Sequence, residues 1–490
     1  MGQNRTNLLE SKIDIESAKD LKPIIDDSRK IKVKHICVLI TLLLFITVVT
    51  ITNYYTRGVS PTEETNGKEK HYILFIIGLI PYLSIPVTIL NCLGLICYNP
   101  YRKVTSAIQG MQSAPFLCFR TVTRGDYPDY VRRNAIANRD KCLKLGIKNF
   151  IIEIVSDKDI NVPDTEDMIR EIVVPKSYTT KNNTLYKARA LNYCLEGHVN
   201  TLASNDWIVH LDEETLVTDS SLHGILHFIT ETDADIGQGP ISYANGDEIK
   251  NWLTTLADSI RLSLDYALFR FQFEYLNCPL FGLKGSYIVI RNKVEMDVGL
   301  DNGPSGSIAE DCFFALKAWA IGYKFQFITG EMKEKSPFTL LDFIRQRRRW
   351  FVGQTYTILC NKIPLVYKLG IMSSLTCCLL MPVSFSNIFI DMIFPYKKPI
   401  AFCFLSGFVG GTFAFLYGFG AFLSCEHRKW SYTRRIFVSL VCCALIIPCS
   451  VVMESIAAYW GLLTLNSNDF FIIQKDTQSR KRRTGHTKIM

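Results

Sequence analysis

Five long apolar runs constrain this chain more than any other feature of its sequence. Two lie near the N-terminus, at about 36–54 and 71–98, and three lie near the C-terminus, at about 369–394, 399–424 and 434–463. Each is long enough to cross a bilayer, since a membrane helix needs roughly 20 mostly apolar residues. The block between the two groups has mixed composition and is long enough for one sizeable domain. The sequence therefore predicts a soluble domain inserted between membrane segments.

Charge around the first apolar run predicts the orientation of the chain. Eight Lys and Arg residues precede residue 35, so the positive-inside rule places the N-terminus and, two spans later, the large domain in the cytosol. The expected organisation is a basic tail (1–34), two spans (35–98), a cytosolic domain (99–365), C-terminal membrane or interfacial helices (366–463) and a basic tail (464–490). Five spans would put the second tail across the membrane, so either one C-terminal run does not cross or the late charges are tolerated there. These flanks account for the net charge of +9, and no nucleic-acid partner is expected.

The central block has the alternation of an α/β fold. Short β-branched or aromatic runs predict strands at 116–122, 149–155, 206–212, 234–241 and 286–291, and helical patterns include 189–197 and 310–322. Ligands of open α/β sheets bind at the carboxyl ends of the strands. Polar clusters follow three of these runs, at 121–126, 156–157 and 212–214, and we expect the functional site there.

Three adjacent acids, Asp212, Glu213 and Glu214, end the strand predicted at 206–212. Asp212 and Glu214 are one residue apart, so their carboxylates can converge on a hard divalent cation, Mg²⁺ or Mn²⁺, that also holds a nucleotide diphosphate. The competing interpretation is a solvated turn whose acids favour the N-terminus of the next helix.

Two later motifs add to this pattern. The segment from Ser307 to Asp311 opens a helix, as either a placed carboxylate or an ordinary helix cap. In the segment from Gln346 to Trp350, arginines stand beside an indole and could grip a diphosphate while the ring frames a sugar. The alternative is a juxtamembrane basic cluster that binds anionic lipid.

Taken in order, these motifs resemble the membrane-bound family 2 glycosyltransferases, which include cellulose, chitin and hyaluronan synthases. Gln346-x-x-Arg349-Trp350 matches that family's Q-x-x-R-W motif fully, whereas Asp212-x-Glu214 carries Glu for the second Asp of DxD, and Ala309 replaces the Thr of TED. A closer resemblance is to the egghead-type β-1,4-mannosyltransferases, carried by FRTVTRGDYPDYV, KARALNYCLE, VHLDEETL, GSIAEDCFFALKAW and EKSPFTLLDFIRQRRRW. That resemblance implies a GT-A-like domain that transfers mannose from GDP-mannose to glucosylceramide in an endoplasmic reticulum or Golgi membrane.

The resemblance also implies roles for individual residues. Asp311 would be the general base of an inverting displacement, Asp212 and Glu214 would hold Mn²⁺ or Mg²⁺, and Gln346 and Trp350 would border the acceptor. The expected donor-binding residues are Thr121, Arg124, Asp157, Lys187, Asp212 and Arg349.

Two alternatives remain open at this point. One is a processive polysaccharide synthase that uses a UDP-sugar, because it shares the Q-x-x-R-W motif. The other is a catalytically silent membrane scaffold, which the presence of Asp212, Glu214, Asp311 and Arg349 disfavours. A transporter is disfavoured because the apolar runs hold little charge beyond Asp391 and Glu454.

Overall fold

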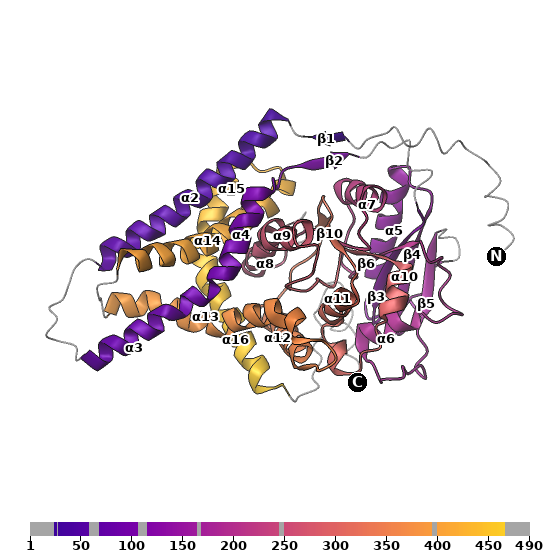
Figure 1. Cartoon of the computed structure of the whole chain (residues 1–490). Helices are drawn as coiled ribbons and strands as arrows, with labels where there is room; N and C mark the ends of the chain where they lie inside the picture. Colours follow the sequence, from indigo (N-terminus) through magenta and orange to yellow (C-terminus); the bar gives the residue numbers. More distant parts are fainter. Residues whose placement is uncertain are drawn as a thin grey trace, which may run out of the picture.

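A sheet domain stands beside a set of membrane-length helices in the computed structural model of this chain (Figure 1). The structure describes residues 24–26, 28–57, 68–105, 115–163, 168–244, 249–393 and 399–465. In Figure 1 the sheet lies on the right, the membrane-length helices extend to the left, and α8, α9 and α12 lie between them. The predicted α/β domain between apolar helices is therefore confirmed.

The sheet of this domain has seven strands in the order β10-β7-β9-β6-β3-β4-β5. Four neighbours, β6, β3, β4 and β5, run parallel, while β9 is antiparallel to both β6 and β7. Their chain order reverses direction between β3 and β6, which is the kind of switch point where ligands bind in open α/β sheets. The strands are β3 (Leu117–Thr123), β4 (Phe150–Ser156), β5 (Ile169–Val173), β6 (Trp207–Leu211), β7 (Ile236–Gln238), β9 (Ile288–Arg291) and β10 (Phe325–Phe327).

Helices cover both faces of the sheet, because successive apolar side chains along its strands point to opposite faces and are buried on both. Val289 packs on the face covered by α5 and α7, and its neighbours Ile288 and Ile290 pack on the opposite face with α6, α10 and α11. These helices are α5 (Pro128–Lys144), α6 (Tyr186–Tyr193), α7 (Asp219–Glu231), α10 (Asn292–Val298) and α11 (Glu310–Ile321). Two short pairs, β1 (Ile24–Asp26) with β2 (Lys103–Thr105) and β8 (Ile241–Ser242) with β11 (Met332–Lys333), lie outside the main sheet.

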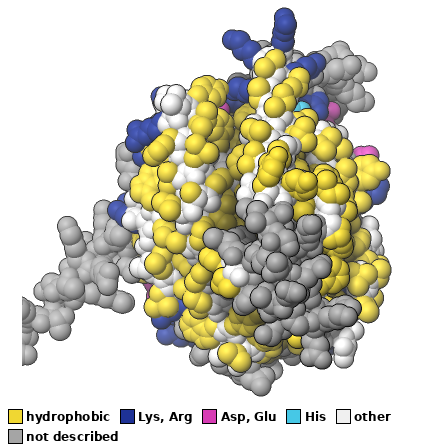
Figure 2. Space-filling view, turned by 90° about the vertical axis from the view of Figure 1, so that its left-hand side faces the viewer, with side chains coloured by type: hydrophobic (Ala, Val, Ile, Leu, Met, Phe, Trp, Pro, Cys, Tyr) yellow, Lys and Arg dark blue, Asp and Glu magenta, His cyan; other side chains and the backbone are white. Residues whose placement is uncertain are grey.

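Within the described residues, five helical segments are long and apolar enough to cross a membrane, at the five predicted runs: Arg29–Tyr55, Ile73–Cys97, Leu365–Asn387, Ile400–Arg428 and Tyr432–Leu463. They are formed by α2 (Arg29–Arg57), α3 (Lys68–Leu79) with α4 (Ile85–Cys97), α13 (Leu369–Ile393), α14 (Ile400–Ser424), and α15 (Tyr432–Val441) with α16 (Ile447–Leu463). Seen from the end away from the sheet domain, most of the coloured side chains of the described residues are apolar (Figure 2). Of the predicted tails at 1–34 and 464–490, residues 1–23 and 466–490 lie outside the described residues, and α2 begins at Arg29 within the first of them.

The membrane helices and the sheet domain share one apolar core. A single cluster of buried side chains includes Leu42 and Ile46 of α2, Phe415 of α14, and Ile288 and Phe325 of the sheet. The connecting helices α8 (Trp252–Leu264), α9 (Arg270–Glu274) and α12 (Leu340–Leu359) lie between these two parts (Figure 1). A site at the sheet edge is thereby held against the membrane helices.

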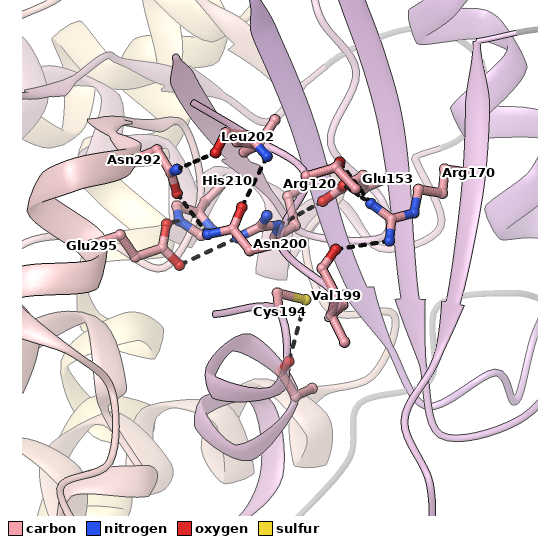
Figure 3. Close-up of polar contacts among 12 residues, drawn as sticks. Arg120, Glu153, Arg170, Cys194, Val199, Asn200, Leu202, His210, Asn292 and Glu295 are labelled. Carbon is pink, nitrogen blue, oxygen red and sulfur yellow. Dashed lines mark hydrogen bonds and ion pairs between the residues drawn. The ribbon is translucent and has the colours of Figure 1, made fainter. Parts of the chain in front are cut away.

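A buried ion network crosses the middle of the sheet (Figure 3). Arg120 donates to Glu153 at 2.9 Å and lies 3.4 Å from Glu295, while Glu295 contacts His210 Nε2 at 3.0 Å. Burial alone would raise the pKa of Glu295, but His210 and Arg120 outweigh it and hold that pKa below its ordinary value. Each buried charge in this group has an opposite partner, as the low-dielectric interior requires.

Candidate functional site

A cavity of about 1800 Å³ opens where β3, β4 and β6 end. Arg124, Asp157 and Asp212 follow these three strands and line the cavity together. From there the cavity continues past the first turn of α11 and along α12 until it lies between α2, α4, α13 and α14. One space therefore joins the polar edge of the sheet to the interior of the membrane helices.

The three acids after β6 have different surroundings, although all of them line the cavity. Asp212 Oδ1 accepts a hydrogen bond from Lys187 Nζ at 2.7 Å. Glu213 Oε2 accepts from Thr123 Oγ1 at 2.6 Å, which ties the acidic turn to the end of β3. Glu214 is only 6% exposed. The turn is therefore a built part of the cavity wall, which argues against the interpretation as a solvated turn.

The donor chemistry of Asp212 and Glu214 fits a divalent cation that arrives with a nucleotide. No group of three His, Cys, Asp or Glu side chains that could hold a metal occurs in the described parts of the chain. Mg²⁺ commonly takes one or two carboxylates and completes its coordination with substrate phosphates and water. Two carboxylates on the wall of this cavity match that requirement, whereas the described residues form no all-protein cage.

Asp311 lies in the first turn of α11, half-buried, and faces the same cavity. Its Oδ1 accepts from the backbone N–H of Cys312 at 2.7 Å. Burial and the neighbouring Glu310 raise the pKa of Asp311 to about 7, against the lowering effects of that N–H, Lys187 and Arg349. A carboxyl group with this pKa is suited to take a proton near neutral pH.

Lys187 links the two acidic groups of the site. Its Nζ donates to Asp212 Oδ1 and to the carbonyl of Gly285, both at 2.7 Å, and lies 3.8 Å from Glu310 Oε1. Burial would lower the pKa of Lys187, but Asp212 and Glu310 outweigh it and raise that pKa. A Cβ at Gly285 would lie 3.2 Å from Asp311 Oδ2 and 3.7 Å from Lys187 Nζ, so the absence of a side chain there leaves room for both groups.

The arginine run on α12 divides between the cavity and the protein interior. Gln346, Arg349 and Trp350 line the cavity, as predicted for a binding motif. Arg348 is buried instead and donates to Thr464 Oγ1 at 2.7 Å.

Arg347 is held from two sides and supports the motif beside it. Its Nε donates to Glu454 at 2.6 Å, and its Nη2 contacts Asp258. The same guanidinium donates to Gln346 Oε1 at 3.1 Å and lies 4.3 Å from the centre of the Trp350 ring. The juxtamembrane lipid-binding interpretation does not account for these inward contacts.

The other predicted donor residues lie at the mouth of the cavity or just below it. Asp157 accepts from Arg189 at 3.0 Å, and Arg124 is more than half exposed. Thr121 is buried in β3 and is not among the lining residues, whereas Val122 and Thr123 are.

Several charged groups of the cavity wall were missed by sequence reasoning. Lys284 Nζ pairs with Asp265 at 2.5 Å, and Glu334 accepts from Thr215 at 2.7 Å, and all three charged residues line the cavity. Burial lowers the pKa of Lys284 despite Asp265. Glu334 stands in the string EKSPF, which also carries the family resemblance, but Lys284 and Asp265 belong to no recognisable motif.

Comparison with known proteins agrees with this geometry. The model of the Glycosyl transferase family group 2 matches residues 207–465, a range that contains the acidic turn, Asp311 and the α12 motif. The chain belongs to this family. It is thus a glycosyltransferase, and its apolar helices make it a membrane protein.

Curated relatives match over most of the chain. The β-1,4-mannosyltransferase egh of Drosophila melanogaster is 41% identical over 446 residues, which cover 89% of this chain and 96% of the relative. The β-1,4-mannosyltransferase bre-3 of Caenorhabditis elegans is 42% identical over 406 residues, 83% of this chain and 89% of the relative. A solved structure, S. aureus TarS 1-349, matches 66% of this chain and 90% of its own with 11% identity and a TM-score of 0.29, which is too low to support any inference.

Proposed function

We propose that this glycosyltransferase moves mannose from GDP-mannose to the glucose of glucosylceramide and forms a β-1,4 linkage. The observation that carries the proposal is the continuity of the cavity, which joins strand-end acids and a base to a space between membrane helices. A nucleotide-sugar fits the polar end, and a glycolipid fits the other, with its sugar between them. The names of the relatives support mannose as the transferred sugar.

In the proposed reaction Asp311 acts as general base. An acceptor hydroxyl forms a bond to the anomeric carbon of mannose while the bond from that carbon to the diphosphate breaks, and the hydroxyl proton passes to Asp311. The electron pair leaves with GDP, and attack from the face opposite the diphosphate inverts the configuration. Lys187, which contacts Asp212, and Arg349 on the cavity wall would supply positive charge to the leaving diphosphate.

Asp212 and Glu214 would hold Mn²⁺ or Mg²⁺ together with the phosphates of the donor. When bound, such an ion stabilises the charge that develops on the departing diphosphate. In this chain Lys187 already neutralises Asp212, and it would have to share that carboxylate with the ion.

The acceptor end is proposed at Gln346 and Trp350. Trp350 contacts the guanidinium groups of Arg347 and of Arg261, at 4.3 and 4.5 Å from the ring centre, so its indole is held in place beside the path to the membrane helices. We place the domain on the cytosolic side of an endoplasmic reticulum or Golgi membrane, which the basic residues before the first span support.

The experiment is transfer by the purified full chain, with labelled GDP-mannose or UDP-sugars, glucosylceramide as acceptor, and Mn²⁺ or Mg²⁺ added or withheld. One added mannose per acceptor, dependent on GDP-mannose and metal, is the expected result. A ladder of products from a UDP-sugar would instead identify a polymer synthase. No transfer from any donor would point to a silent scaffold.

A further inference from the structure

The membrane part of the cavity is shaped for the apolar portion of a ligand. Its lining there includes Val49 of α2, Val87 of α4, Met381 and Phe385 of α13, and Phe413 of α14. This part is continuous with Gln346 and Trp350 near the reacting groups. Because aliphatic and aromatic walls favour lipid tails, the acceptor's backbone would cross the region just inside the membrane helices.

One polar side chain in this apolar region has an unused hydrogen-bond acceptor. Asn91 of α4 lines the cavity and is 3% exposed. Its Nδ2 donates to the carbonyl of Val87 at 2.9 Å, and because a carbonyl can only accept, this contact fixes which way the amide points. Among the described residues, Asn91 Oδ1 has no hydrogen-bond partner. A buried acceptor without a donor costs free energy, so the site favours a ligand that brings a donor.

The depth of Asn91 matches a lipid backbone more closely than lipid tails. It lies six residues before Cys97, the last residue of α4, which is about 9 Å along the helix at 1.5 Å per residue. Nearby hydroxyls on the same wall already have partners: Thr88 donates to the carbonyl of Ser84, and Thr412 contacts Cys92 Sγ. Each of these two hydroxyl groups thus has at least one partner, whereas Asn91 Oδ1 has none among the described residues.

We propose that Asn91 accepts a hydrogen bond from the backbone of an amide-linked lipid acceptor and selects it over an ester-linked one. A glycosylated ceramide backbone carries an amide N–H and a hydroxyl, whereas a glycosylated diacylglycerol backbone carries ester oxygens and no donor. The inference rests on the proposed function and goes further, because it assigns the choice between two glycolipid classes to one side chain.

The test compares transfer to β-glucosylceramide and to β-glucosyl-diacylglycerol of matched chain length, with the full chain in nanodiscs. Asn91→Leu removes the acceptor at similar volume. We expect kcat/KM for glucosylceramide to fall about three- to tenfold, the range of hydrogen bonds inside membranes, with a much smaller change for the glycerolipid.

Asn387→Leu is the matched control. Asn387 of α13 also lines the cavity, is 6% exposed and has an amide oxygen without a partner among the described residues. Asn387 Nδ2 donates to the backbone carbonyl of Ile77 in α3. Ile77 precedes Asn91 by 14 residues, so Asn387 lies about 20 Å deeper along the helices than Asn91. We expect this variant to keep the wild-type preference. Equal losses for both acceptors in Asn91→Leu, or no loss, would overturn the proposal.

A binding measurement separates this inference from the proposed function. Labelled 1-O-methylceramide, which carries no sugar, is bound to the wild type and to Asn91→Leu in competition with 3-O-methyl-diacylglycerol. In each lipid the methyl ether occupies the oxygen that bears the sugar in the glycolipid, so the glycerolipid offers no hydrogen-bond donor. If the wild type prefers the ceramide lipid and Asn91→Leu does not, the result supports the site. This holds even if the wild type transfers no mannose, a result that would refute the proposed function but not the lipid site. Equal retention of both lipids by the wild type refutes the site. Melting curves and gel filtration establish that each variant is folded.

Discussion

If Asp311 is the base, the rate should depend on pH in a way that an ordinary aspartate would not produce. Its pKa is raised from 3.8 to about 7, and only the ionised carboxylate can accept the acceptor's proton. With that pKa, about one molecule in eleven is ionised at pH 6 and about one in a hundred at pH 5, so kcat/KM should fall roughly tenfold per pH unit below 7. An aspartate with a pKa of 3.8 would stay ionised across this range and give a flat profile.

Two variants test whether the acidic limb of that profile belongs to Asp311. Glu310→Gln removes the neighbouring charge that helps to raise the pKa of Asp311, so the limb should move to lower pH while the plateau rate changes less. Asp311→Asn should lower the plateau by about 10² to 10⁴ and abolish the limb. Glu231→Gln, an exposed acid on α7 away from the cavity, is the control and should leave the profile unchanged.

The assay is the initial rate of mannose transfer at varied GDP-mannose, between pH 5 and 9, because kcat/KM for the donor reports groups of the free enzyme. Metal is kept saturating at each pH. A profile that stays flat from pH 5 to 8, or one that keeps its limb in Asp311→Asn, would refute the assignment of the limb to this carboxylate.

Four further predictions follow from contacts in the site and the core. The folded state holds the Asp311 proton up to about pH 7, whereas the unfolded chain loses it near pH 3.8, so the wild type loses stability as pH rises between these values. Asn resembles the protonated acid at every pH. Asp311→Asn should therefore melt at a higher temperature than the wild type at pH 8 and at nearly the same temperature at pH 4. Glu295→Gln should lower the free energy of unfolding by about 1 to 3 kcal/mol, because it removes the carboxylate that His210 contacts and one of the two carboxylates beside Arg120, which keeps Glu153. Since the pKa of Glu295 is lowered, the melting difference should shrink as pH falls below 4.5. Mn²⁺ should bind weakly in calorimetry without GDP and tightly with it, and Glu214→Gln should remove that linkage. Glu454→Gln should loosen Arg347 and raise KM for the lipid acceptor while the affinity for GDP stays near the wild-type value.

Local pattern predicted the sheet strands that build the site. The apolar runs at 116–122, 149–155 and 206–212 became β3, β4 and β6 within one residue at most boundaries, because each is a short β-branched run bounded by turn residues. Helix 310–322 is likewise α11, which ends at Gly322 with φ +107°. The run at 234–241 was divided by a proline into β7 and β8. Strand β5 carries a charged, half-buried sequence and was not predicted.

The residue chosen at the end of β3 shows how a small boundary difference changes a site. Thr121 was predicted as a donor-binding residue at the strand end, but β3 continues to Thr123. Side chains alternate along a strand, so Thr121 and Thr123 point to the same face, and Thr123 is the one that reaches the rim and contacts Glu213. The strand thus ends two residues beyond Thr121, and a role of Thr121 in donor binding stays a prediction.

Contacts between distant segments could not be predicted, because hydrophobic periodicity describes only a residue's own element. Glu454 was noted in the sequence only as a rare charge in an apolar run, and nothing there connects it with Arg347, 107 residues earlier. In the structure the ion pair with Arg347 accounts both for the half-buried position of Glu454 among the membrane helices and for the position of the α12 motif. A charge inside a membrane segment needs a partner, and here the partner stands beside Trp350, at the end of the cavity proposed to bind the acceptor. The last membrane helix thus helps to position the site, so changes in its packing should alter acceptor use before they alter donor binding.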